Sequence, residues 1–442
     1  MTCPNTVEHG GDMSLTATTR KRRKDLVAVN IGNTLEWFDW NIYAVFSPFF
    51  AAHFFQSDDP ISALLSTLAV FAAGFLMRPV GGWFFGRIAD ERGRRFSLTL
   101  AITLAALGSL AIAVAPTFDT VGVLASVILL AARLLQGLSH GGETGSAFTY
   151  LAEVAPTERR GLWAASPWLG VGIGSILATA LGATLTAVLS DGAMAAYGWR
   201  IPFAIGALLG LYAIYIRLTM EESRVYRDAA ERTAAEGTPR VTLGQAFAEL
   251  WRERAGALRI VGLTISGVVA FYTWFIFAPN YATTAHGMDD TTALVTGTLG
   301  QAVFLVAIPL MGAASDRWGR RPVLLVFSVG FALAAFPLEL VLGGNPWTLF
   351  ATMALASVLL AANCAPLGAV FAELVPTRQR ATIIGIAYAT SAALLGGTAP
   401  YLNTWLADLG LHLLFVAYLV LLCVISTVVL LFMPETRGRE LR

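Results

Sequence analysis

The chain has 442 residues, of which 56% are hydrophobic and only 13% are charged. Soluble domains carry about 25% charged residues, so this composition argues against a water-soluble protein and favours an integral membrane protein. The three cysteines, Cys3, Cys364 and Cys423, show neither metal-ligand nor CxxC spacing. The sequence therefore predicts no disulfide framework and no metal site.

The N-terminal region predicts a cytoplasmic tail and not a cleaved signal. Residues 1–19 are largely polar, and a basic run at 20–24 leads directly into a long apolar stretch. A secretory signal would instead place a short apolar region and a small-residue cleavage site soon after the start. We expect residues 1–26 to form a tail in front of an uncleaved first membrane helix.

Twelve apolar stretches are long enough to cross a membrane, which takes about 20 residues of helix. A longer charged segment, about 220–255, separates the sixth stretch from the seventh and reads as a soluble linker. The predicted spans are 27–54, 61–85, 96–115, 121–148, 161–189, 200–219, 257–283, 291–314, 322–343, 347–373, 381–406 and 411–433.

The distribution of lysine and arginine predicts the orientation. Of the 30 basic residues, all except Arg78, Arg133 and Arg200 lie in the two tails, in the polar region 217–259 or in alternate short loops. The remaining loops carry none. Because basic residues concentrate in cytoplasmic loops, we expect a multi-pass protein of the plasma membrane with both termini and the linker in the cytoplasm.

The two halves of the chain repeat each other. The sequence GRIADERGRR at 86–95 returns as GAASDRWGRR at 312–321, and AEVAPTERR at 152–160 returns as AELVPTRQR at 372–380. We predict an all-α integral membrane fold of two pseudo-symmetric six-helix bundles, with a binding site near the midplane between them. The predicted parts are an N-terminal tail at 1–26, a bundle at 27–219, a linker at 220–255, a bundle at 256–433 and a tail at 434–442.

Four more motifs of the N-terminal half narrow the class of protein. They are GNTLEWFDW at 32–40, FLMRPVGG at 75–82, RLLQGLSHGGE at 133–143 and GWRIPF at 198–203. With the loop motif, they make the chain resemble the major facilitator superfamily, and within it the metabolite:proton symporters. Residues 66–100 are most similar to the α-ketoglutarate permeases. The resemblance implies a transporter that works by alternating access, and not an enzyme.

Polar residues of the first span are candidates for transport chemistry. Asn33, Glu36, Asp39 and Tyr43 recur at helical spacing and so share one face. Charged groups inside a span cost about 2.5–3.5 kcal/mol each, so we expect this face to line the central cavity. Glu36 and Asp39 are predicted to carry protons, and the alternative is that one of them pairs with a cation for folding. Asn33 and Tyr43 are predicted to contact the substrate.

Arg78, beside Pro79 in the second span, is the candidate for binding an anionic group. A guanidinium holds a carboxylate by two parallel hydrogen bonds, and the resemblance to the α-ketoglutarate permeases implies this role. The alternative is a structural pair with Asp39 or Glu36. In the second half, Tyr272 is predicted to contribute to the substrate site. Other polar or aromatic groups within spans of that half are Trp274, Asn280, Gln301 and Asn363.

The fourth span carries a second polar face. Arg133, Gln136, His140 and Glu143 follow one another at i, i+3, i+7 and i+10, which places them on one side of a helix. The resemblance implies a proton-coupling or gating role for Arg133. His140 is either a proton carrier, because imidazole titrates near neutral pH, or a packed polar residue. Glu143 is expected to complete the coupling network.

The repeated motifs predict a cytoplasmic gate. In the first motif, the glycines are expected to keep the turn between helices short, and the aspartate is expected to lie at a helix N-terminus. The arginines are expected to pair with a glutamate, and such pairs must break when the gate opens. The candidate gating residues are Gly86, Asp90, Gly93, Arg94, Arg95 and Glu153 in the first half, and Gly312, Asp316, Gly319, Arg320, Arg321 and Glu373 in the second.

These features predict a proton-coupled symporter that imports a small organic acid, with a dicarboxylate such as α-ketoglutarate as the leading substrate. Moving a dianion inward costs about 2 × 2.3 kcal/mol per 100 mV, which co-transported protons offset. One alternative is a symporter for a zwitterion such as proline or betaine, held by an aromatic cage of Trp37, Trp40, Tyr43 and Tyr272. Another is a facilitator-type exporter. The expected partners are the organic acid, protons and the lipid bilayer; we expect no cofactor, no nucleic acid and a monomer.

Overall fold

The computed structural model describes residues 10–57, 59–92, 94–141, 155–219, 251–376 and 380–441. All regular structure in these ranges is helical, which confirms the predicted fold class. The expected linker at 220–255 lies almost wholly outside the described residues, as do Gly93, Glu143 and Glu153.

The N-terminal half is built from helices of very different length, because short 3₁₀, α and π segments interrupt the long spans. They are α1 (Gly10–Phe54), α2 (Pro60–Arg92), α3 (Arg94–Ala113), α4 (Phe118–Val121), α5 (Val123–His140), η1 (Thr157–Arg159), α7 (Arg160–Ala164), α8 (Ser166–Val188), α9 (Asp191–Ala193), η2 (Met194–Gly198) and α10 (Arg200–Thr219).

The C-terminal half contains two spans in which a π-helical segment joins two α-helices. Its elements are α13 (Arg254–Ala270), η3 (Phe271–Phe277), α14 (Ala278–His286), α15 (Asp290–Trp318), α16 (Arg320–Val341), α17 (Pro346–Leu374), α18 (Arg380–Ser391), η5 (Ala392–Gly396), α19 (Ala399–Asp408) and α20 (His412–Phe432).

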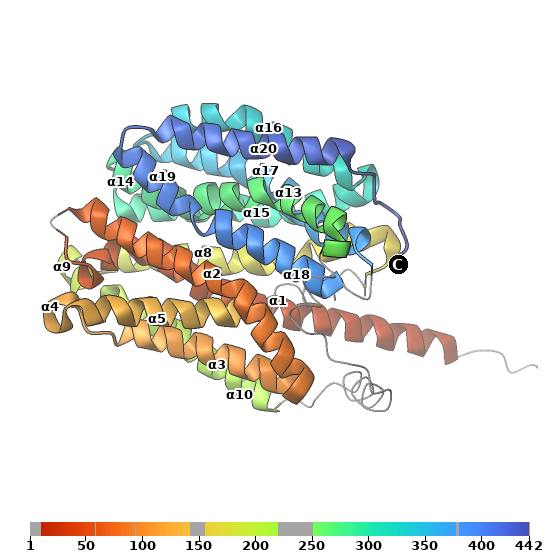
Figure 1. Cartoon of the computed structure of the whole chain (residues 1–442), viewed down its shortest axis with the longest axis horizontal. Helices are drawn as coiled ribbons and strands as arrows, with labels where there is room; N and C mark the ends of the chain where they lie inside the picture. The colour runs from red at the N-terminus through yellow and green to blue at the C-terminus, as the bar shows by residue number, and fades with distance from the viewer. Residues whose placement is uncertain are drawn as a thin grey trace, which may run out of the picture.

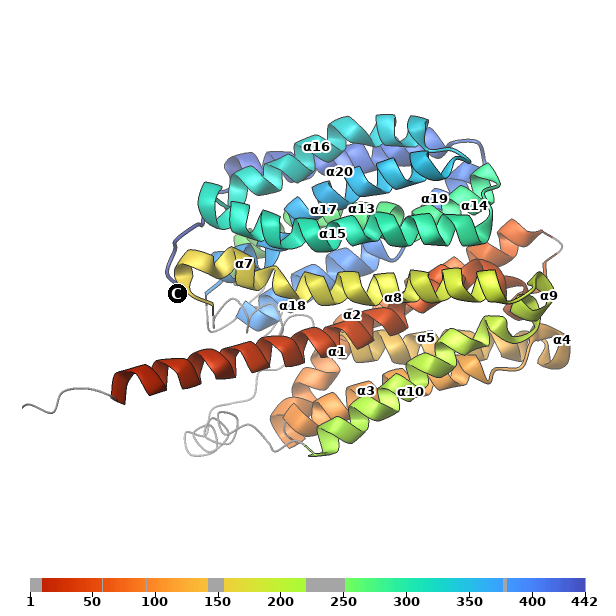
Figure 2. The same cartoon turned by 180° about the vertical axis from the view of Figure 1, so that it is seen from behind.

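Eleven helices of the described chain are long and apolar enough to cross a membrane. The helix α1 is not among them, since Glu36, Asp39 and Asn41 interrupt its apolar residues, but it lies along α2 and α8 in the same bundle. It also begins earlier than predicted, at Gly10, and projects beyond the bundle (Figures 1 and 2).

The spans form two groups that lie side by side, α1–α10 and α13–α20 (Figures 1 and 2). Where the groups meet, α8 packs along α15, and α2 packs against α18, η5 and α19. The C terminus and the turn between α15 and α16 lie at one end of the bundle, here called the tail end; α4, α9 and the turn between α14 and α15 lie at the opposite end, the far end (Figure 1).

Glycines let α2 and α5 approach backbone to backbone. A side chain added at Gly137 would collide with the carbonyl oxygen of Gly74, and one added at Gly141 would collide with the carbonyl oxygen of Arg78. Small residues permit such close packing between membrane helices. The contact brings Arg78 of α2 close to the polar face of α5.

The glycines of the loop motifs play two different roles. Gly319 has φ of 109° and turns the chain between α15 and α16, a conformation that favours glycine. The expectation that Gly86 shortens a turn is wrong, because α2 continues through it to Arg92. Its counterpart Gly312 also lies within a helix, where it packs against the backbone of Leu162. The side chains of Asp90, Arg94 and Arg95 lie outside the described part of the chain.

Candidate substrate site and gates

Two buried arginines lie against the same indole ring. The guanidinium carbon of Arg78 lies 4.2 Å from the centroid of Trp40, and that of Arg133 lies 4.0 Å from it. Arg78 also contacts the ring of Phe75 at 4.0 Å, and Arg133 that of Tyr43 at 4.2 Å. Aromatic faces stabilise guanidinium groups that are removed from water. This cluster keeps two positive charges in the interior of the N-terminal half.

Both arginines retain unused hydrogen-bonding capacity. The Nε and Nη2 atoms of Arg78 and of Arg133 are buried and have no hydrogen-bond partner among the described residues. Buried guanidinium donors are normally paired, since leaving them unsatisfied costs free energy. The Tyr272 hydroxyl of the other half lies close to the Arg78 guanidinium, and the donors that remain unpaired among the described residues could bind an anion.

Asp39 is tied to one of these arginines through an amide. Ser109 Oγ donates a short hydrogen bond to Asp39, and Gln136 Nε2 donates to Asp39 Oδ2 at 3.0 Å. Arg133 Nη1 in turn donates to Gln136 Oε1 at 2.8 Å. The chain of contacts joins α1, α3 and α5 and provides a buried counter-charge for Arg133.

Glu36 and His140 form a second polar pair nearby. His140 Nδ1 contacts the Glu36 carboxylate, and the imidazole is almost fully buried. The imidazole ring packs edge-on against Trp40, with centroids 4.7 Å apart, and lies 6.4 Å from Trp37. A carboxylate and an imidazole in contact can share or release a proton, so this pair is suited to proton transfer next to the arginines.

A narrow central pocket lies between the halves beside this cluster. Trp37 and Trp168 line it from the N-terminal half, and Tyr272, Asn363 and Tyr388 line it from the C-terminal half. Trp37 also lies 5.9 Å from the Arg78 guanidinium, and the Tyr272 hydroxyl is within electrostatic reach of both arginines. Residues of both halves therefore line this pocket, and the two arginines lie behind its wall on the side of Trp37 and Tyr272.

A larger cavity of about 460 Å³ opens at the far end, and we call it the vestibule. Ala51 of α1 and Leu64 of α2 line it from one half, and Tyr281, Glu339 and Asn403 line it from the other. Its walls are apolar on the N-terminal side and polar on the C-terminal side. The vestibule is the larger of these two spaces between the halves.

Aromatic rings separate the vestibule from the central pocket. Phe71 of α2 meets Phe277 of η3 at 6.1 Å, and Phe75 of α2 meets Tyr272 of η3 at 5.1 Å between centroids. Phe75 rests directly on the backbone of Gly397, where a Cβ would collide with its ring. The barrier thus joins the two halves and is only a few rings thick.

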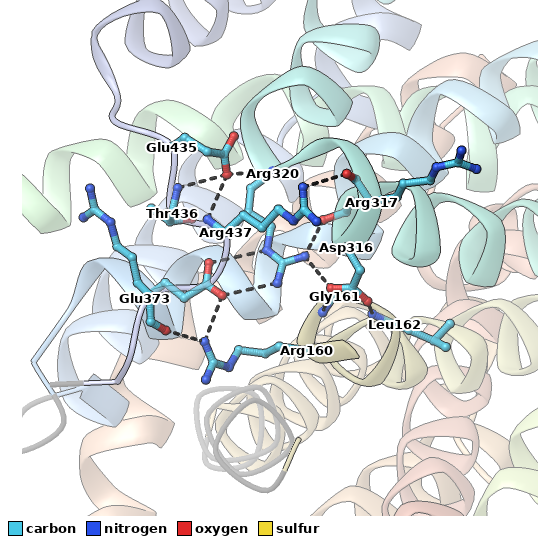
Figure 3. Close-up of polar contacts among 12 residues, drawn as sticks. Arg160, Gly161, Leu162, Asp316, Arg317, Arg320, Glu373, Glu435, Thr436 and Arg437 are labelled. Atoms are coloured by element: carbon cyan, nitrogen blue, oxygen red, sulfur yellow. Dashed lines mark hydrogen bonds and ion pairs between the residues drawn. The ribbon is translucent and has the colours of Figure 1, made fainter. Parts of the chain in front are cut away.

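The tail end is closed by a buried ion-pair network (Figure 3). Arg160 Nη1 of the first half lies 3.1 Å from Glu373 Oε1 of the second half, and Arg320 Nη2 lies 3.3 Å from the same oxygen. Arg320 Nη1 also binds Asp316 Oδ1 at 2.7 Å. The network therefore links the two halves at the tail end.

Asp316 adds a second link across the halves. Its two carboxylate oxygens accept hydrogen bonds from the backbone N–H groups of Gly161 at 2.7 Å and Leu162 at 2.9 Å (Figure 3). A carboxylate is favoured at a helix N-terminus, where N–H groups are unpaired. The carboxylate of Asp316, the counterpart of Asp90 in the repeat, thus lies at the start of α7, whereas the prediction made for Asp90 falls on a side chain outside the described part of the chain.

The C-terminal residues bind to the same network. Glu435 accepts hydrogen bonds from the backbone N–H groups of Arg320, Thr436 and Arg437 at 2.9–3.0 Å (Figure 3). It also accepts one from the backbone N–H of Arg321 at 3.0 Å. Partial desolvation raises the pKa of the Glu435 carboxyl, but these backbone donors outweigh it and hold the pKa below its ordinary value. Glu435 is therefore an ionised anchor for the tail.

Arginines on both sides complete the attachment of the tail. Arg437 Nη1 donates to the carbonyl of Arg317 at 2.7 Å, and Arg160 Nη1 donates to the carbonyl of Arg439 at 2.8 Å. Arg160 belongs to the first half and Arg317 to the second. The tail residues 435–439 therefore bridge the closed gate.

The predicted polar face of the first span does not line the central pocket. Asn33 Nδ2 donates to the Pro167 carbonyl of α8 at 2.6 Å, and the Tyr43 hydroxyl donates to the Thr67 carbonyl of α2 at 2.9 Å. Glu36 and Asp39 point to α5 and α3, as described above. Glu36, Asp39 and Tyr43 all contact α5, and Asn33 contacts α8, so this face packs within the N-terminal half. Trp37 is the α1 residue that lines the pocket.

The charged candidate gating residues of the second half contact one another as predicted, with the exception of Arg321. Asp316, Arg320 and Glu373 meet as expected, but Arg321 does not join them. Its backbone N–H binds Glu435, and its Nη2 donates to the Leu431 carbonyl at 3.0 Å. Arg321 lies on the outer side of the turn, where it contacts the end of α20.

Several site residues were missed by sequence reasoning. Trp168 and Tyr388 line the pocket although both read as ordinary packing aromatics. Ser109 gave no signal, since serine is common in apolar spans. For Arg160 the sequence did contain a signal, because this buried arginine is the last residue of the repeated motif AEVAPTERR. Its partner Glu373 belongs to the second copy of that motif, AELVPTRQR.

These features are those of a helical membrane protein with a pocket where two groups of spans meet. The sequence profile described as "Sugar (and other) transporter" matches residues 26–442. The chain therefore belongs to the sugar (and other) transporter family of the major facilitator superfamily. Its relatives in that family are membrane transporters and not enzymes, as predicted.

Individual relatives agree with this assignment. The chain is 36% identical to the alpha-ketoglutarate permease of Escherichia coli (strain K12), over 98% of each chain. It is 30% identical to the proline/betaine transporter of the same strain, over 96% of this chain and 85% of that protein. The xylose:proton symporter XylE has a similar fold, with a TM-score of 0.74, 19% identity and coverage of 94% of this chain and 96% of that one.

Proposed function

We propose that the protein is a proton-coupled symporter that imports a dicarboxylate such as α-ketoglutarate by alternating access, with both termini in the cytoplasm. The arrangement of Arg78 and Arg133 around Trp40 carries this proposal. Two buried guanidinium groups with free N–H donors match two carboxylates in charge and in hydrogen-bonding geometry. The 36% identity to an alpha-ketoglutarate permease supports the same substrate class.

The aromatic residues favour an anion over a quaternary ammonium. The rings of Trp40 and Tyr43, which could form part of a cage for betaine, are already in contact with guanidinium groups. A second cation beside them would be repelled. A zwitterion such as proline remains the second candidate, because the proline/betaine transporter is 30% identical over most of the chain.

The proton carriers are assigned to Glu36 and His140, with Asp39 as a counter-charge to Arg133. The pair lies beside Trp40, so substrate binding at the arginines and proton binding at the pair affect each other electrostatically. Protons taken up here offset the charge of a dianion. Asp39 is already held by Ser109 and Gln136.

The far end of the bundle is open and the tail end is closed, and this arrangement supports entry of the substrate from outside the cell. The vestibule lies at the far end, and the ion-pair network closes the tail end. If the termini are cytoplasmic, this is an outward-facing arrangement closed by a few aromatic rings. Opening of the network would release the substrate into the cytoplasm.

Uptake by proteoliposomes tests the proposal. We expect labelled α-ketoglutarate to accumulate only when the outside is more acidic, and succinate but not betaine to compete. No gradient-dependent uptake of any dicarboxylate would contradict the proposal. Competition by betaine or proline, without competition by succinate, would favour the zwitterion.

A further inference from the structure

The span that carries Tyr272 contains a π-helical segment, η3, held by a side chain of another helix. Gln301 of α15 is fully buried, and its Nε2 donates to the backbone carbonyl of Phe275 in η3 at 2.7 Å. A π-helical turn shifts the backbone hydrogen bonds of a helix, and a carbonyl within a membrane must be satisfied by the protein. Gln301 supplies that bond.

The other end of the same amide reaches the opposite half. Gln301 Oε1 accepts a hydrogen bond from Thr179 Oγ1 of α8 at 2.9 Å, shorter than the distances from Thr179 Oγ1 to the Ser175 and Ile176 carbonyls of its own helix, 3.1 and 3.2 Å. Thr298 of α15 donates to Thr179 Oγ1 at 3.2 Å. The helices α8 and α15 pack along each other (Figure 2). One side chain thus connects α8 of the first half to η3 of the second.

Gln301 does not touch the proposed site. It lines neither the central pocket nor the vestibule, whereas Phe271 and Tyr272 of η3 line the pocket. An effect of Gln301 on the substrate is therefore indirect, and η3, to which Gln301 is bonded, carries two of the lining residues.

We propose that Gln301 is a positioning residue that holds Tyr272 in the substrate site while Thr179 of the opposite half is hydrogen-bonded to it. When the halves move relative to each other, the bond to Thr179 is strained or lost, and η3 shifts with it. The inference rests on the proposed function in that Tyr272 is taken to contact the substrate.

The chain offers a matched control for this bond. Thr291 of α15 donates to Thr186 Oγ1 of α8 at 2.9 Å, a hydroxyl–hydroxyl bond between the same two helices. Among the described residues, neither of these threonines is hydrogen-bonded to η3. Thr179→Val and Thr186→Val therefore each remove a threonine hydroxyl that bonds α8 to α15, and only Thr179 bonds Gln301; Thr186 is the less buried of the two.

The experiment measures uptake kinetics of wild type, Gln301→Leu, Thr179→Val, Thr179→Ser and Thr186→Val in proteoliposomes. Buried hydrogen bonds in membrane proteins are modest, so we expect KM for α-ketoglutarate to rise about three- to tenfold in Gln301→Leu and Thr179→Val. Vmax per folded protein should change less than KM. Thr179→Ser should restore wild-type KM, and Thr186→Val should retain it. An equal rise of KM in Thr186→Val, or none in Thr179→Val, overturns the inference.

Hydrogen–deuterium exchange separates this inference from the proposed function, because it needs no substrate. We expect backbone amides of 271–277 to exchange faster in Thr179→Val and Gln301→Leu than in Thr186→Val, in protein reconstituted into nanodiscs. Equal exchange in all variants would show that the bond does not hold η3. Absence of dicarboxylate uptake by wild type would contradict the proposed function and leave the exchange result to decide the role of Gln301.

Discussion

At the scale of single residues, Trp40 explains how two arginines can be buried together. Each guanidinium lies about 4 Å from its ring, and cation–π contacts contribute about 2 kcal/mol when water is excluded. This does not compensate fully for two like charges in the interior, so an anion between them should bind well. Sequence alone identified Arg78 and Arg133 as intramembrane charges, but not that they share one aromatic ring.

Replacement of Arg78 tests its role in binding. Arg78→Lys keeps the charge and removes the planar pair of donors, so we expect KM for α-ketoglutarate to rise about ten- to hundredfold, as for loss of a charge-assisted hydrogen bond. Arg200→Lys is the matched control, since Arg200 binds the carbonyls of Ala113 and Ala115 near the far end. Unchanged KM in Arg78→Lys would exclude direct binding.

Replacement of the Glu36–His140 pair tests proton coupling. Glu36→Gln and His140→Asn remove the titrating groups, so accumulation driven by a pH gradient should be lost while exchange of labelled for unlabelled substrate continues. Ser139→Ala, next to His140, removes a bond to the Ala101 carbonyl and should leave coupling intact. Gradient-driven accumulation by both substituted proteins would assign the coupling to another group, with Asp39 next to be tested.

At the scale of elements, the close contact between α2 and α5 positions the binding arginines. Gly137→Ala places a methyl group against the Gly74 carbonyl and forces the helices apart. Overpacking of this kind costs about 1–3 kcal/mol, so the melting temperature of the purified protein should fall by several degrees. Gly385→Ala in α18 is the control, because among the described residues no atom outside its own helical turn lies within 4 Å of the added Cβ. Equal melting temperatures would contradict the tight contact.

The helices also show which structural features could be predicted from the sequence and which could not. Apolar length located the spans, because burial in lipid depends on local composition. The π-helical segments η3 and η5 were not predicted, since one shifted hydrogen bond leaves hydropathy unchanged. The continuation of α2 through Gly86 was missed for a related reason: glycine is tolerated within a membrane helix where a neighbouring helix packs on it, as α7 packs on Gly312.

At the scale of the whole molecule, the proposed transport cycle links the two ends of the bundle: the ion-pair network closes the tail end in the state in which the vestibule is open at the far end. Arg160→Ala leaves the buried Glu373 with one cation fewer and removes a bond to the tail. The tail end should then open more often and the far end close. We expect a cysteine introduced at Ala52 in the vestibule to react about tenfold more slowly with an impermeant thiol reagent.

Controls for this prediction are available at the same end. Arg317→Ala removes an exposed side chain whose backbone carbonyl, and not its guanidinium, contacts the tail, so the Ala52→Cys reactivity should not change. The native Cys364 and Cys423 are buried and should contribute little background, and the third cysteine, Cys3, is replaced by serine in every variant. Faster reaction in Arg160→Ala would mean that the network does not hold the tail end closed.

Hydropathy was sufficient for the all-helical membrane fold, and the motifs of the first half were sufficient for the family. These properties belong to short segments of sequence, because the insertion of each span into the bilayer depends on the composition of that span. Which polar groups meet was decided by tertiary packing. Asp39 of α1 accepts a hydrogen bond from Ser109 of α3. Arg160 binds Glu373, which lies 213 residues away in the sequence, because α7 packs against the other half. Helix rotation and the contact between halves are collective, and no single segment encodes them.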